Sequence, residues 1–182
     1  TDAQRAFLQR LADAIAEAIA AKAGEAGGSD SGARGGAAAT AAERAFRYVF
    51  RSKDVYEGGW SLARRHGHGR CEFASGCVYE GEWEANKPCG RGTMRWRDGS
   101  VYEGEWRAGV PDGRGTLRSF GASYSGEWRA GAKHGRGRVE WPSGDVYEGR
   151  VKHDRLCGFG TMRYAGERVA YMGYWRDGVR HG

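Results

Sequence analysis

One short pattern returns along most of this chain at almost constant spacing. Its clearest copy reads VYEGEW at residues 101–106 and continues, after a short turn, as GRGTLR at residues 113–118. The tyrosine recurs at spacings of 23, 23, 22, 23 and 24 residues, as Tyr56, Tyr79, Tyr102, Tyr124, Tyr147 and Tyr171. Four residues after it stand Trp60, Trp83, Trp106, Trp128, Val151 and Trp175. A fixed period of this length indicates a repeat array, in which each unit buries its apolar face by stacking on its neighbours.

Each copy predicts a β-hairpin. Because successive side chains of a strand point to opposite faces, Tyr102, Gly104 and Trp106 share one face, and Glu103 and Glu105 take the other. In the following strand the arginines fall on the glutamate side and the glycines on the aromatic side. Glycine beside large rings leaves room for them and tolerates a sharp twist. The pattern therefore predicts a sheet with one aromatic face and one face of glutamate and arginine strands.

This pattern, Tyr-x-Gly-x-Trp followed by Gly-x-Gly-x-hydrophobic, resembles the MORN repeat. The resemblance covers about residues 54–182, with five full copies and a truncated sixth. It implies a mostly β fold, an elongated single-layer twisted antiparallel sheet of stacked hairpins with an aromatic-lined groove. It also implies a scaffold or adaptor at membrane–cytoskeleton junctions, or the non-catalytic part of a larger enzyme such as a lipid kinase or histone methyltransferase. A fold of this kind does not by itself fix a function.

The first 53 residues differ from the array. Residues 1–23 predict an N-terminal amphipathic α-helix that ends at Gly24, with an apolar stripe formed by Phe7, Leu8, Leu11, Ile15 and Ile19. Residues 24–39 are typical of a flexible linker. Within residues 40–53 we expect a short helix and then an edge strand at about 47–51, with helix throughout as the alternative. The apolar stripe would dock on this sheet, pair with a second copy, or bind a partner.

The net charge of +6 lies entirely in residues 51–182, because residues 1–50 hold six basic and six acidic residues. A basic face could attract anionic phospholipid, and its candidate residues are Arg91, Arg95, Arg114, Arg118, Arg136 and Arg138. The favoured interpretation is that much of this stripe pairs with glutamates on the neighbouring strands. Nucleic-acid binding is not favoured, because the aromatic residues lie on the face opposite the arginines.

The repeats offer no recognisable catalytic or cofactor site. The residue before each Gly-x-Gly is a metal-ligand type in every copy, namely His66, Cys89, Asp112, His134, Cys157 and His181. Equivalent residues would lie two strands apart, roughly 9.5–10 Å, so they cannot gather around one metal ion, and we expect them to close the hairpin turns. The four cysteines lack Cys-x-x-Cys spacing, and free thiols are expected. We predict a protein that is not an enzyme, with no cofactor and no metal.

The aromatic face is the predicted partner surface. We expect an exposed groove lined by Tyr79, Trp83, Tyr102, Trp106, Tyr124, Trp128 and Tyr147, with a helix of a protein partner as its ligand. The alternative is that these rings only pack on one another as a core. A homodimer through the N-terminal helix or an end of the sheet is a further candidate.

Two further expectations concern irregularity and location. The fifth copy has Arg150 and Val151 where the others have glutamate and tryptophan, which indicates sequence drift, a local bend or a partner contact. The chain has no signal peptide or apolar span, so we expect a cytoplasmic protein, and the resemblance to the MORN repeat implies association with the cytoskeleton or a membrane. A start at Thr1 and an end at Gly182, inside the sixth copy, suggest a piece of a longer protein.

Overall fold

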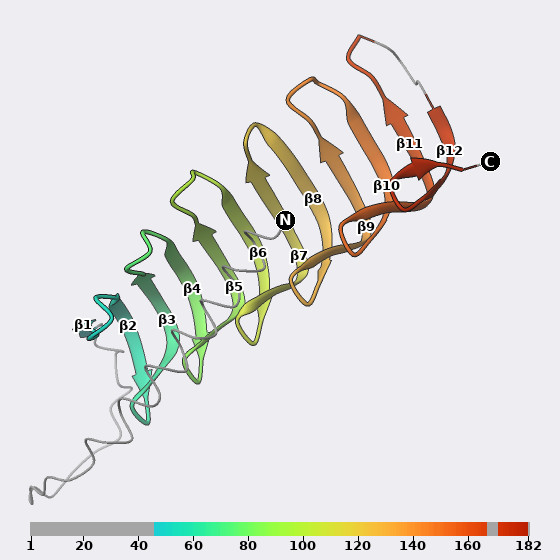
Figure 1. Ribbon diagram of the computed structural model, residues 1–182. Helices are drawn as coiled ribbons and strands as arrows, with labels where there is room; N and C mark the ends of the chain where they lie inside the picture. Colours follow the sequence, from blue (N-terminus) through green and yellow to red (C-terminus); the bar gives the residue numbers. More distant parts are fainter. Residues whose placement is uncertain (1–45, 167–170, 182) are drawn as a thin grey trace, which may run out of the picture.

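The computed structural model describes residues 46–166 and 171–181, which form one open antiparallel sheet of 13 strands. The strands follow one another in the sheet in the order of the sequence, so the hairpins are stacked along one long axis (Figure 1). They are β1 (Phe46–Val49), β2 (Val55–Ser61), β3 (Arg64–Glu72), β4 (Val78–Glu84), β5 (Lys87–Arg95), β6 (Val101–Arg107), β7 (Val110–Ser119), β8 (Ala122–Arg129), β9 (Ala132–Glu140), β10 (Val146–Lys152), β11 (Arg155–Arg163), β12 (Tyr171–Arg176) and β13 (Val179–Arg180).

The prediction of a mostly β, elongated antiparallel sheet is confirmed. Strand β1 pairs with β2 at the edge of the sheet where the sequence predicts an edge strand. The predicted helix at residues 1–23, the linker at 24–39 and the short helix after residue 40 lie outside the described residues.

Tight two-residue turns connect the two strands of each hairpin. In the turn between β4 and β5, Ala85 and Asn86 both have positive φ, of 47° and 71°, as a two-residue type I′ turn requires. The second turn residue also joins neighbouring hairpins, because the Asn86 N–H donates to the Arg65 carbonyl at 3.1 Å. Equivalent bonds join Gly109 to Pro88 and Gly131 to Pro111 at 2.9 and 2.8 Å. Each hairpin is therefore tied to the one before it.

Each repeat bends sharply at its glycines. Tyr79 and Trp83 are four residues apart on β4, a separation of about 13 Å in an extended strand. Their ring centroids are only 5.0 Å apart, so the strand turns between them, around Gly81. A Cβ on Gly81 would lie 2.5 Å from the Gly92 Cα, and a Cβ on Gly92 would lie 2.2 Å from the Tyr79 hydroxyl oxygen. Only glycine at these two positions lets the tyrosine ring lie across the backbone.

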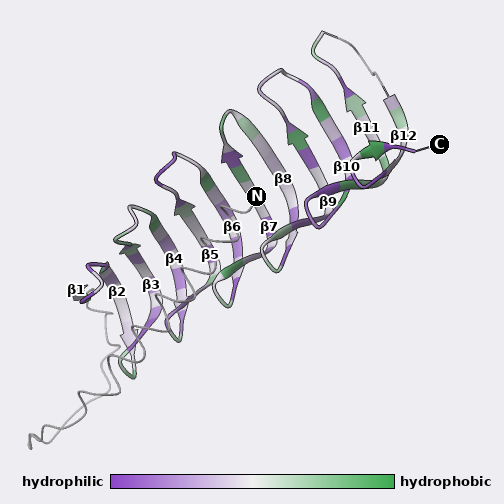
Figure 2. Ribbon diagram, viewed as in Figure 1, coloured by the Kyte–Doolittle hydropathy of each residue, from purple (hydrophilic) through white to green (hydrophobic). Residues whose placement is uncertain are grey.

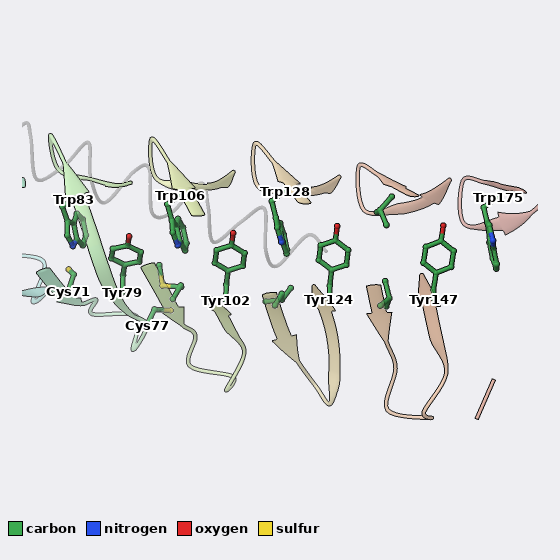
Figure 3. Close-up of a cluster of buried hydrophobic side chains, with 14 of the residues drawn as sticks. Cys71, Cys77, Tyr79, Trp83, Tyr102, Trp106, Tyr124, Trp128, Tyr147 and Trp175 are labelled. Atoms are coloured by element: carbon green, nitrogen blue, oxygen red, sulfur yellow. The ribbon is translucent and has the colours of Figure 1, made fainter. Parts of the chain in front are cut away.

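The bend closes the aromatic face on itself and makes it the core. Figure 3 shows the tyrosines rising from one limb of the bent sheet and the tryptophans descending from the other. From Tyr56 to Trp128 the rings meet edge to face at 5.0–5.4 Å, both within a repeat and between repeats. Polar side chains occupy the opposite face, so hydrophilic and hydrophobic segments lie along the same strands (Figure 2).

The tyrosine hydroxyl stabilises the bend directly. The Tyr102 O–H donates to the Glu105 carbonyl at 3.0 Å, and five other repeat tyrosines make the same bond to the residue three positions on. We predict that Tyr102→Phe lowers the free energy of unfolding by about 1–3 kcal/mol, because it leaves a carbonyl at the bend without its donor. Urea unfolding followed by circular dichroism measures the change.

Tyr174→Phe is the matched control, since the Tyr174 side chain is 62% exposed on the polar face. It should change the stability by about 0.5 kcal/mol or less. Equal losses in the two variants would contradict a specific role for the hydroxyl at the bend.

Candidate functional site

The seven predicted groove residues lie side by side in one row, but the row is buried. Their exposed fractions are at most 4%, for Tyr79, Trp83, Tyr102, Trp106, Tyr124, Trp128 and Tyr147. The expectation of an exposed aromatic strip is therefore wrong, and the alternative of rings packed as a core describes the structure. The reason is the bend at the glycines, which alternation along a strand does not reveal. The predicted helix contact face, Phe7, Leu8, Leu11, Ile15 and Ile19, lies outside the described residues.

The polar atoms of these rings form hydrogen bonds with backbone carbonyl groups. The Trp83 Nε1–H donates to the Gly69 carbonyl at 2.9 Å, and Trp106 and Trp128 bond the preceding repeat in the same way at 3.0 and 3.1 Å. Burial raises the pKa of Tyr79, Tyr102 and Tyr124, and it raises the pKa of Tyr147 to about 12. The aromatic row therefore contributes to stability, and its hydroxyls stay protonated at neutral pH.

The hollow surface of the array lies on the opposite, polar face. It has a volume of about 1000 Å³ and crosses the sheet from His68 on β3 to Arg136 on β9. We call it the polar hollow. Its lining includes His68 and eight charged side chains, with glycines between them; the charged residues are Arg91, Arg114, Arg118, Arg136, Glu80, Glu103, Glu105 and Glu127. Four arginines and four glutamates thus face one open space, which can accept a ligand with charges of both signs.

The charges of the polar hollow form rows across the strands. We define the charge row as a series of side chains that are directly opposite one another between hairpins and are separated by a bulge within each hairpin, namely His68, Glu82, Arg91, Glu105, Arg114, Glu127, Arg136, Arg150, Phe159 and Tyr174. Arg91 stands opposite Glu105, and Arg114 stands opposite Glu127. Basic and acidic residues alternate as far as Arg136.

The glutamates of the charge row also hold the backbone. The Glu82 carboxylate accepts the Arg91 backbone N–H at 2.8 Å, and the Glu127 carboxylate accepts the Arg136 backbone N–H at 2.9 Å. These bonds span the irregular pairing after Gly81 and after Gly126, where the register of the strands shifts by a bulge. The carboxylates are therefore fixed in direction, while the neighbouring guanidinium groups extend into solvent.

The predicted arginine stripe divides into two groups. Arg91, Arg114, Arg118 and Arg136 line the polar hollow, whereas Arg95 and Arg138 do not. Arg138 pairs with Glu148 and with Glu140, the latter at 3.6 Å. In the part of the chain that the structure describes, the other five side chains form no ion pair, so the interpretation that much of the stripe is paired holds only for Arg138. An arginine that stands opposite a glutamate on the next strand does not thereby bring its guanidinium group within ion-pair distance of the carboxylate.

The fifth repeat interrupts the aromatic row. Val151 occupies the place of tryptophan and is buried. The Lys133 ammonium instead approaches the Tyr124 ring, 5.3 Å from its centroid, and burial lowers the pKa of that lysine. Beside it, His134 and His153 pack edge to face with centroids 5.4 Å apart. The sequence shows the substitution of tryptophan, but not that a lysine takes part of its place.

Five of the six metal-ligand types named from the sequence lie in the second strands, after the turns, and His181 follows β13. Cys89, for example, is on β5 opposite Glu82, and Ala85 and Asn86 form the turn. The expectation that this position closes the hairpin turn is therefore wrong. Over residues 46–166 and 171–181 no three such side chains are grouped as a metal site would require. All four cysteines are free, as the spacing predicts.

Sequence and structure comparisons place the array among known proteins. A family model described as MORN repeat matches six consecutive segments, at residues 56–78, 79–101, 102–119, 124–146, 147–166 and 171–182. None of the curated proteins compared with the chain matches it. One similar solved structure is the TCP domain of Drosophila melanogaster SAS-4 (dCPAP) in complex with a proline-rich motif of Ana2 (dSTIL). It aligns over 79% of this chain and 86% of that one, with 10% identity and a TM-score of 0.41.

Among the described residues there is no helix with the length and apolar character needed to cross a membrane.

The buried tyrosines predict a loss of stability at high pH. Burial raises the folded-state pKa of Tyr147 to about 12, above the value near 10 of an unfolded tyrosine. Its contribution is fully present below about pH 10 and is lost as the pH rises toward 12, because only the unfolded state readily releases the proton. We expect the urea midpoint to fall between pH 9 and 11.5, and Tyr147→Phe to reduce this fall. Tyrosinate absorbance appearing fully before the loss of circular dichroism would contradict the prediction.

Proposed function

The chain belongs to the MORN repeat family, and from this array we propose a non-catalytic scaffold that holds a protein partner in the polar hollow. Proteins of this family are in general non-catalytic repeat modules. The observation that carries the proposal is the open space of about 1000 Å³ lined by charged side chains and floored by glycines. The buried aromatic row supports it by giving the hollow a rigid base.

The dimensions of the polar hollow suit a helical segment of the partner. From β3 to β9 there are six strand steps of about 4.8 Å, which gives a length of about 29 Å. A helix of about 20 residues is about 30 Å long. The backbone of Gly92, Gly104 and Gly115 lies between the charged side chains in the lining of the hollow.

The charge pattern suits a partner that carries both signs. Arg114 and Glu127 stand opposite one another in the hollow, and so do Arg91 and Glu105. A partner with alternating acidic and basic side chains would find a complementary charge at each step, and one with a single sign would meet repulsion at half of them. We propose that such a scaffold acts at a membrane–cytoskeleton junction, in line with the resemblance noted from the sequence.

Binding to anionic phospholipid is the second candidate. It is supported by Arg91, Arg95, Arg114 and Arg118, whose side chains form no ion pair within the described ranges. The four glutamates of the hollow weigh against it, because they would repel a flat anionic surface. A lipid site predicts flotation with phosphatidylserine vesicles that is released by added salt.

Charge reversal inside the hollow tests the scaffold. Proteins captured by the full chain from cells are purified singly, and their Kd values are measured against the wild type and against Arg114→Glu. We expect Arg114→Glu to weaken a partner seated in the hollow at least 10-fold, about 1.4 kcal/mol. The matched control is Arg97→Glu, an exposed arginine between β5 and β6 that does not line the hollow.

The two outcomes separate the candidates. A partner whose affinity falls with Arg114→Glu and not with Arg97→Glu supports the protein scaffold. Equal affinity of every purified partner for both variants would contradict it. Vesicle binding that falls with Arg114→Glu, in the absence of such a partner, would favour the lipid site.

A further inference from the structure

The alternation of the charge row ends in the fifth repeat. Glu82, Glu105 and Glu127 hold one position of the row in three earlier repeats, and Arg150 holds it in the fifth. Arg150 stands directly opposite Arg136 on the neighbouring strand. Residues opposite one another in a sheet have Cβ atoms about 4.5–5.5 Å apart, and like charges there destabilise the pairing. This is a break in a pattern that the preceding strands keep.

No carboxylate of the described chain neutralises this pair. Neither Arg136 nor Arg150 forms an ion pair with any residue that the structure describes. The nearby Glu148 is already bonded to Arg138 and lies 3.5 Å from Arg163. The Arg150 side chain instead lies over Gly158, with its Cδ 3.2 Å from where a Cβ would stand on that glycine. Earlier repeats place a carboxylate over the equivalent glycine.

Beyond the arginine pair the polar face becomes apolar. Phe159 follows Arg150 in the charge row, and its ring meets Tyr174 at 5.7 Å edge to face. Phe159 and Tyr174 are 52% and 62% exposed, and Met172 on β12 is 61% exposed. Met172 takes the place of Glu80, Glu103 and Glu148 in other repeats. Exposed aromatic and methionine side chains beside arginines are typical of protein-binding surfaces.

We propose that this end of the polar face, formed by Arg136, Arg150, Phe159, Met172 and Tyr174, binds an acidic polypeptide segment that carries an apolar side chain next to its carboxylates. We call it the terminal patch. A carboxylate of the partner takes the place of the glutamate that the repeat has lost and lies between the two guanidinium groups. The neighbouring apolar side chain packs on the rings of Phe159 and Tyr174.

The charges around the terminal patch favour a peptide over a membrane. Glu127 and Glu148 flank the arginine pair on the same face. A narrow segment can place one or two carboxylates between the arginines and avoid these glutamates, whereas an extended anionic surface would face them all. The proposal goes beyond the partner of the polar hollow, and it stands even if that hollow proves empty.

The sequence of the array supplies variants that remove the patch without introducing a foreign residue. Arg150→Glu and Tyr174→Glu each restore the glutamate of the earlier repeats, so the double variant should unfold at the same temperature as the wild type or above it. A random dodecapeptide display library is selected on the full wild-type chain after depletion on this double variant. Enriched peptides are synthesised, and their Kd values are measured by fluorescence anisotropy. Arg114→Glu, in the middle of the polar hollow, is the control.

We expect enriched peptides to carry at least two carboxylates within a few residues of Phe, Trp, Tyr or Leu. Their Kd should rise at least 10-fold with Arg150→Glu, while Arg114→Glu changes it less than 2-fold. Failure to enrich acidic peptides, or equal binding to the wild type and the double variant, would overturn the proposal. If no peptide is enriched, and phosphatidylserine vesicles bind the wild type but not the double variant, the patch is a membrane site. This result would also overturn the proposal. If Arg114→Glu weakens peptide binding and Arg150→Glu does not, the peptides bind in the polar hollow, and the proposal is wrong.

Discussion

Each repeat depends on a tyrosine ring that lies flat across two glycines. For Tyr79 these are Gly81 and Gly92, and a methyl group on either one would overlap the ring or the opposing backbone. The ring holds the bend, and its hydroxyl bonds the carbonyl three residues on. Because the bend turns the aromatic face inward, a single layer of sheet has an interior. Over the described residues, the aromatic row is therefore closed to a partner, and the polar face stays open.

The period of the sequence predicts the strands, their order and the composition of both faces. Strand β1 lies at the edge of the sheet, where an edge strand at about residues 47–51 is expected. The period does not predict the bend, since alternation states which face a side chain occupies and says nothing about the angle between the halves of a strand. Tyr79 and Trp83 could equally have been about 13 Å apart on a straight strand. They are 5.0 Å apart, and this distance decides that the rings are core and not surface.

The polar face shows a similar limit. Composition and alternation place arginines and glutamates on one face, and register places Arg91 opposite Glu105. Whether two such side chains meet depends on their rotamers and on other acceptors, as the Glu82 carboxylate bonded to a backbone N–H illustrates. The sequence alone shows where the pattern is broken, at Arg150 and Val151. Their meaning required the structure, because only pairing across strands shows that Arg150 faces Arg136.

The missing tryptophan at Val151 divides the aromatic row into two lengths. Edge-to-face contacts run without interruption from Tyr48 to Tyr124, and a second series joins Tyr147, Trp175 and Tyr171. Neighbouring hairpins contact only one another, so a weak contact at one step lowers the coupling between everything on its two sides. The fourth and fifth hairpins are therefore joined by the uninterrupted β9–β10 backbone ladder and by the contact of the Lys133 ammonium with the Tyr124 ring, and not by paired aromatic rings.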